Sequence, residues 1–111
     1  MTKIELHGQL LDELKEVYAR KNKRYGDSVK KTFDEYGAVA FCLRLDDKLS
    51  RAKQLLLHPI EVNEVDSYES AYNHETVIDT LMDLANYAVI AAMEIRLKRE
   101  AEIEGTVKSV V

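Results

Sequence analysis

The sequence predicts an all-α protein, a helical bundle of about four helices that is completed by oligomerisation. Pro59 is the one proline in 111 residues, and only four glycines interrupt the chain, so long segments are free of helix breakers. Apolar residues recur at spacings of three and four, and strand-like alternation is missing. A chain of this length is expected to form one domain, 1–111, with a core over about 3–101.

The first two helices are predicted over 3–24 and 28–35. Thr2 and Glu5 have the spacing of a capping box ahead of the first apolar pattern. Residues 25–28, YGDS, interrupt that pattern, because a glycine permits a positive φ and the following Asp or Ser can cap a new helix.

A longer helix is predicted over 37–57. His58-Pro59 ends it, since a proline disfavours helix in the residue before it. The predicted core face repeats at helical spacing and consists of Ala38, Phe41, Cys42, Leu45, Leu49, Ala52 and Leu56. The lone Cys42 excludes an internal disulfide and a cysteine-based zinc site, and we expect it to be a small buried hydrophobe in a reducing compartment.

The last helix is predicted from an Asn73 cap to about residue 101. Residues 59–72 are polar and irregular, which predicts a long, flexible loop ahead of that helix. The tail 102–111 is expected either to fray or to pack its valines on a partner.

Charge and hydropathy exclude several function classes. A net charge of −4 argues against direct nucleic-acid binding, which needs a basic face. The N-terminus lacks a signal-peptide pattern, and no apolar run reaches the roughly 18 to 20 residues that span a membrane. We therefore expect a cytoplasmic protein without membrane contact. The histidines lack ligand spacing and are expected at the surface or at caps: His7, His58 and His74.

Three acids in register mark the last helix, in the stretch ETVIDTLMDLANY. Glu75, Asp79 and Asp83 are each separated by four residues, so they share one helical face. The main apolar face is predicted to lie elsewhere, at Val77, Leu81, Leu84, Ala88, Ala91 and Ile95. Further apolar residues, such as Met82 and Ile90, fall in the sector of the acids, which predicts that water is scarce around them.

Sheltered carboxylates need a cation, because uncompensated burial costs several kcal/mol or forces protonation. Carboxylate oxygens suit Mg2+, with Mn2+ as a substitute. The alternative is an ion-pair network with Arg44, Lys48 or Arg51. Spacing alone leaves both readings open.

Residues 44–51, RLDDKLSR, supply a second charged strip. Asp47 lies off the predicted core face, where it can add a fourth carboxylate to a metal site. Arg44, Lys48 and Arg51 are suited to phosphate oxygens. The competing interpretation is a solvated charged face.

The stretches YGDS, RLDDKLSR and ETVIDTLMDLANYA resemble a small all-helical family of phages and Firmicutes, described as a nucleotide modification associated domain. The likeness covers roughly residues 15–95. The family pattern includes Tyr25-Gly26-Asp27, Asp47, Lys48, Arg51, Glu75, Asp79, Asp83, Asn86 and Tyr87. More remotely, the chain is similar to the MazG and all-helical dUTPase group, oligomeric enzymes that hydrolyse nucleoside triphosphates with Mg2+. It departs from their E-x-x-E and E-x-x-D pairs, since its last helix carries E-x-x-x-D-x-x-x-D.

The resemblance and the charged strips together predict a Mg2+-dependent nucleotide-binding protein or a nucleoside triphosphate pyrophosphohydrolase that forms a homodimer or homotetramer. Glu75 would be the general base, and Lys48 and Arg51 would stabilise charge on the phosphates. Tyr25 or Tyr87 would stack on a base, with Asn86 beside them, although tyrosines in helical bundles are more often core or rim residues. The alternative is a non-catalytic helical interaction module of a phage or prophage, whose acids form salt bridges between helices.

Overall fold

A computed structural model describes the backbone of residues 1–25, 27–58 and 67–110, and the side chains of residues 1–23, 27–58 and 77–105. Within these ranges the chain forms four α-helices and no strand, so the predicted all-α class is confirmed. The helices are α1 (Lys3–Tyr25), α2 (Ser28–Tyr36), α3 (Val39–Leu57) and α4 (Ser67–Val110).

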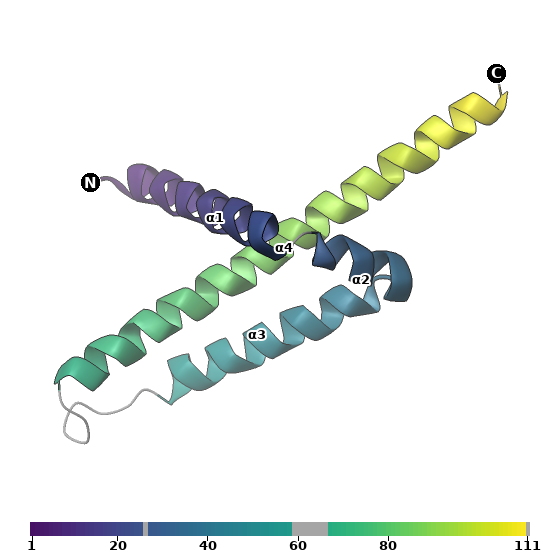
Figure 1. The fold of residues 1–111 in the computed structure, drawn as a ribbon. Coiled ribbons are helices and arrows are strands. Elements are labelled where there is room, and N and C mark those ends of the chain that lie inside the picture. Colours follow the sequence, from purple (N-terminus) through teal and green to yellow (C-terminus); the bar gives the residue numbers. More distant parts are fainter. Residues whose placement is uncertain (26, 59–66, 111) are drawn as a thin grey trace.

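The long helix α4 is the axis on which the other three are arranged (Figure 1). Helix α3 runs antiparallel along α4 and makes the most extensive contact between any two helices. Helix α2 is a short connection that packs on the start of α3. Helix α1 crosses the middle of α4 and contacts it over a much smaller area.

The first three helices begin and end within two residues of their predicted bounds. The capping pattern at the N-terminus is real, because the backbone N–H of Glu5 donates to Thr2 Oγ1 over 3.1 Å. Asp27 occupies the N-cap position of α2 but makes no side-chain capping hydrogen bond. Gly26 lies outside the described residues.

Both predicted bounds of the last helix are wrong. Helix α4 begins at Ser67, so the second half of the predicted loop 59–72 is helical, and Asn73 lies within the helix instead of capping it. It also continues to Val110, through most of the predicted tail 102–111. The segment contains no proline, and its one glycine, Gly105, does not end the helix.

The core is small and lies where α2, α3 and α4 meet. Phe33 and Phe41 pack with their ring centroids 4.8 Å apart, against Ile90 and Ala91 of α4. Tyr18 and Val29 pack against this cluster from α1 and α2. The cluster therefore ties all four helices together near the middle of the molecule.

Helix α3 buries only part of its predicted core face. Phe41 and Ala52 are buried and Leu45 is half-buried, as is Lys48 beside them, whereas Leu49 and Leu56 are 42% and 55% exposed. Cys42, which was expected to be buried, is also exposed. The face that meets α4 thus runs through Phe41, Lys48 and Ala52, and the apolar stripe beside it remains uncovered.

Helix α4 likewise buries only part of its predicted apolar face, since Ala91 is buried and Val77 and Leu84 are half-buried. Its buried residues are Thr80, Ile90, Ala91 and Glu94. Leu81, Ala88 and Ile95, which belong to the predicted main apolar face, are exposed. The acid-bearing sector therefore borders the packed side of this helix.

The molecule is elongated, with extents of 69 × 33 × 25 Å and a radius of gyration of 18.4 Å. A compact domain of this length would have a radius of gyration of about 13 Å. Among the described residues, no helix is both long enough and apolar enough to cross a membrane.

Gly37 forms the turn between α2 and α3 with φ +75° and ψ −159°, a conformation that is costly for residues other than glycine. We expect Gly37→Ala to lower the free energy of unfolding by about 1 to 3 kcal/mol in urea denaturation. Gly8→Ala is the matched control, since both glycines have nothing within 4 Å of an added Cβ. Alanine at position 8, within α1, should stabilise the protein by up to about 1 kcal/mol. Equal effects of the two substitutions would contradict this account.

Candidate functional site

A cleft of about 320 Å³ opens where α1 and the start of α2 face α4. Helix α4 supplies its floor through four successive inward positions. The lining residues are Tyr18, Lys21, Asn22, Ser28, Val29, Asp83, Asn86, Tyr87 and Ile90. Three residues of the predicted site, Asp83, Asn86 and Tyr87, therefore line one cavity.

Asp83 joins three helices through its carboxylate. Lys48 of α3 donates to Asp83 Oδ2 over 3.2 Å, and Lys21 of α1 lies 3.9 Å from Oδ1. The Asp83 and Lys48 side chains are 36% and 30% exposed, whereas that of Lys21 is 61% exposed. The closer pair is thus partly shielded from water, while Lys21 is held loosely at the rim.

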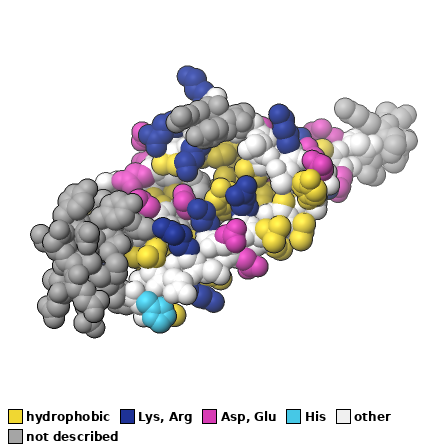
Figure 2. Space-filling view, turned by 60° about the horizontal axis from the view of Figure 1, so that its bottom comes forward, with side chains coloured by type: hydrophobic (Ala, Val, Ile, Leu, Met, Phe, Trp, Pro, Cys, Tyr) yellow, Lys and Arg dark blue, Asp and Glu magenta, His cyan; other side chains and the backbone are white. Residues whose placement is uncertain are grey.

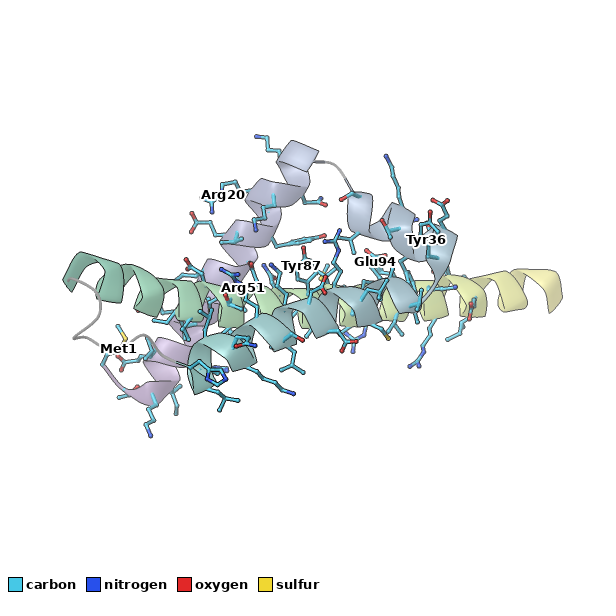
Figure 3. The ribbon with its side chains drawn as sticks, turned by 90° about the horizontal axis from the view of Figure 1, so that it is seen from below. Met1, Arg20, Tyr36, Arg51, Tyr87 and Glu94 are labelled. Carbon is cyan, nitrogen blue, oxygen red and sulfur yellow. The ribbon has the colours of Figure 1, made fainter. Side chains whose placement is uncertain are left out.

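Tyr87 separates this cleft from a second, smaller cavity of about 150 Å³ that Arg44 and Phe41 line from α3. Lys48 Nζ lies over the ring of Tyr87, 6.0 Å from its centroid, which is near the outer limit for a cation–π contact. In Figure 3, Tyr87 lies in the space between α1, α2 and the α3–α4 pair. Lys48 and Arg44 therefore approach the same aromatic ring from α3.

Asn86 holds α1 against α4. Its side-chain amide donates to the backbone oxygen of Leu14 over 3.4 Å, a long hydrogen bond. Within the part of the chain that the structure describes, the amide oxygen of Asn86 has no hydrogen-bond partner. Tyr18 lines the same cleft, and burial, together with the charges of Asp27 and Glu94, raises the pKa of its phenol. A neutral hydroxyl and a free amide oxygen are thus available to a ligand.

Helix α2 begins at this cleft, because Ser28 and Val29 both line it. The N–H groups of a first helical turn lack partners within the helix, and here the Asp27 side chain does not cap them. They add a partial positive charge to the cleft wall.

The predicted metal ligands are not brought together in the described part of the chain. Asp47 and Asp79 are exposed, and they form no group with Asp83 that could hold a metal ion. The expectation that water is scarce around the acids is thus wrong for Asp79 in the single chain. Glu75 lies outside the described side chains, so the full set of four ligands remains a prediction.

The chemistry of the described donors does not fit a magnesium site. Mg2+ takes oxygen ligands in near-octahedral geometry. Among the side chains that the structure describes, Asp83 is the one acid that lines the cleft, and two ammonium groups already accompany its carboxylate. This is the ion-pair arrangement that the sequence offered as its alternative, with Lys48 as one of its named partners.

Arg51 and Tyr25 complete the predicted set. Arg51 is exposed and lines neither cavity within the described residues. Tyr25 ends α1, but its side chain lies outside the described residues, so its predicted role in stacking remains a prediction.

Sequence reasoning missed the contribution of α1 to the site. Tyr18, Lys21 and Asn22 extend the inward face that begins at Leu10, Leu14 and Val17, at steps of three and four residues. A polar continuation of an apolar helical face was the available signal.

Glu94 is a buried acid, 7% exposed, one helical turn beyond Ile90. Burial raises the pKa of its carboxyl, the charges of Asp27 and Asp34 raise it further, and Lys30 opposes them. Lys30 itself is bound to Asp34 over 2.7 Å, which limits its use as a partner for Glu94.

Comparison of this chain with protein-family models, with curated proteins and with solved structures finds no match.

The raised pKa of Glu94 makes stability fall as the pH rises. The folded state favours the neutral carboxyl, so stability is lost from the unfolded pKa, about 4.3, up through the raised folded pKa. Glu94→Gln should therefore raise Tm at pH 7.5, and the gain should vanish below pH 4, as measured by circular dichroism. Exposed Glu100→Gln is the control, with little expected change at either pH. A lower Tm for Glu94→Gln at pH 7.5 would show that the carboxylate makes a stabilising contact.

Proposed function

We propose that the cleft between α1, α2 and α4 binds a nucleotide. The observation that carries this proposal is the arrangement of two cations around Asp83 and Tyr87 of the cleft. Lys21 lines the cleft itself, and Lys48 lies outside its lining, paired with Asp83 and beside the Tyr87 ring. Its volume of about 320 Å³ lies at the small end of the range for ligand pockets.

One end of the cleft suits phosphate. Lys21 of α1 and Lys48 of α3 both pair with Asp83. Each ammonium has three N–H donors, and the Asp83 carboxylate does not use all of them, so donors remain for a phosphate. Arg44 adds a third cation in the adjoining cavity. Figure 2 shows basic side chains gathered over the middle of one face of the molecule, with acidic side chains between them.

The aromatic and amide groups of the cleft lining suit a nucleobase. Tyr18 and Tyr87 offer aromatic surface, and Asn86 offers an amide oxygen that can accept from an exocyclic amine. Base–aromatic stacking contributes about 1 to 3 kcal/mol and tolerates any base. These groups support binding of a nucleotide without identifying its base.

Magnesium-dependent pyrophosphate hydrolysis is a narrower proposal, and its support is the resemblance of the sequence motifs. It requires Glu75 as general base and a metal held among Asp47, Asp79 and Asp83. The described acids do not gather at one point, so they do not by themselves form a metal site at which hydrolysis could occur. Pyrophosphate release from a nucleoside triphosphate panel with Mg2+ or Mn2+ tests it directly.

A helical interaction module, the second function class, is favoured by the uncovered apolar stripes. Leu49 and Leu56 on α3, and Leu81 and Ile95 on α4, are each between 36% and 55% exposed. Hydrophobic side chains reach the surface in Figure 2. With the elongated shape, these stripes support association of this chain with a second copy, as a homodimer or homotetramer.

Tyr87→Leu tests the nucleotide site. Removing the ring should weaken nucleotide binding by about 5- to 150-fold in isothermal titration calorimetry, if one base stacks on it. Tyr36→Leu is the control, since Tyr36 is 63% exposed at the end of α2, away from the cleft. Equal affinities for both variants, or no heat with any nucleotide, would remove the proposal. The Tm of each variant shows whether it is folded.

Leu49→Glu combined with Leu56→Glu tests the interaction surface. Sedimentation equilibrium should show an oligomer for the unaltered chain and a monomer for this variant, because charges on an apolar interface oppose burial. Lys53→Glu, an exposed change on the same helix, should leave the oligomer intact. A monomeric unaltered chain would refute self-association.

A further inference from the structure

We propose that the cleft binds the phosphate of a nucleoside monophosphate directly on the ammonium groups of Lys21 and Lys48, without a bridging metal, and that Asp83 opposes this binding by occupying both lysines. This inference rests on the proposed nucleotide site. It reverses the role of Asp83, from metal ligand to internal competitor of the phosphate.

The first argument is the charge balance around Asp83. Its carboxylate is held at 3.2 Å by Lys48 and 3.9 Å by Lys21, so two positive charges meet one negative charge. The surplus is positive, which favours an anion over a cation in the same place. A metal ion brought to Asp83 would instead face two ammonium groups at contact distance.

The second argument is the unequal hold on the two lysines. Lys48 is 30% exposed and makes a hydrogen bond with Asp83, whereas Lys21 is 61% exposed and is only within ion-pair distance. Weak exposed pairs contribute little to stability, so Lys21 turns toward a ligand at low cost. Lys48 is not part of the cleft lining; it lies against Asp83 and beside Tyr87, and it contacts the phosphate when Asp83 gives way.

The third argument is the size and charge of the ligand. A monophosphate carries a charge of about −1.5 to −2 at pH 7, which a pair of lysines matches. The cleft of about 320 Å³ is compact, and its remaining lining of Tyr18, Asn86 and Tyr87 leaves one side for a nucleoside. A longer phosphate chain would need additional cations, which the described lining of this cleft does not provide.

The experiment measures affinity of the full chain for the four common 5′-nucleoside monophosphates and their nucleosides, by calorimetry in EDTA and then in Mg2+. Asp83→Asn should tighten monophosphate binding in EDTA by about two- to fivefold, because the amide carries no charge to occupy the lysines. Lys21→Met should weaken it by about tenfold or more, through loss of a charge-assisted contact. Nucleoside affinity should change little in both variants.

Matched controls lie on the same helices. Asp79→Asn removes an exposed acid one turn before Asp83, and Lys23→Met removes an exposed lysine two residues after Lys21; each should alter affinity less than twofold. Monophosphate binding that requires Mg2+ and weakens in both Asp79→Asn and Asp83→Asn would overturn the inference and leave the nucleotide site standing. A fall in Tm for Asp83→Asn with unchanged affinity would overturn it as well, since the three residues would then be a structural ion pair. Absence of binding by every nucleotide would reject the site itself.

Discussion

The rotational setting of α3 against α4 is the constraint on which the rest of the structure depends. Phe41 of α3 meets Ile90 and Ala91 in the small core, and that contact fixes which face each helix presents to the other. Once it is fixed, Lys48 lies opposite Asp83. The polar pair that builds the site is therefore a consequence of apolar packing elsewhere along the same interface.

This setting separates the chain into two kinds of surface. The inward sides of α3 and α4 combine a modest apolar cluster with the Lys48–Asp83 pair, and α1, α2 and α4 enclose the cleft that Asp83 and Tyr87 line. The outward sides carry leucines that a single copy leaves in water. Burying them in an oligomer gains free energy at about 25 cal/mol per Å² of apolar surface, which a small core alone does not supply.

The acids of α4 illustrate how position decides chemistry. Asp79 and Asp83 are one turn apart, yet Asp79 is exposed and Asp83 is bound by two lysines from neighbouring helices. Glu94, farther along, is buried, and this burial raises the pKa of its carboxyl. One helix thus carries an exposed carboxylate, an ion-paired carboxylate and a buried carboxyl with a raised pKa.

The sequence by itself determined the helical class and the bounds of the first three helices, because periodicity and helix breakers are local properties. It did not determine the length of α4, since nothing local distinguishes a polar helix from a polar loop, nor the contribution of Lys21. Only the tertiary structure decided which face of each helix is buried. Neighbouring faces of α3 and α4 are similarly apolar, so their choice depends on how Phe33, Phe41 and Ile90 fit together in space.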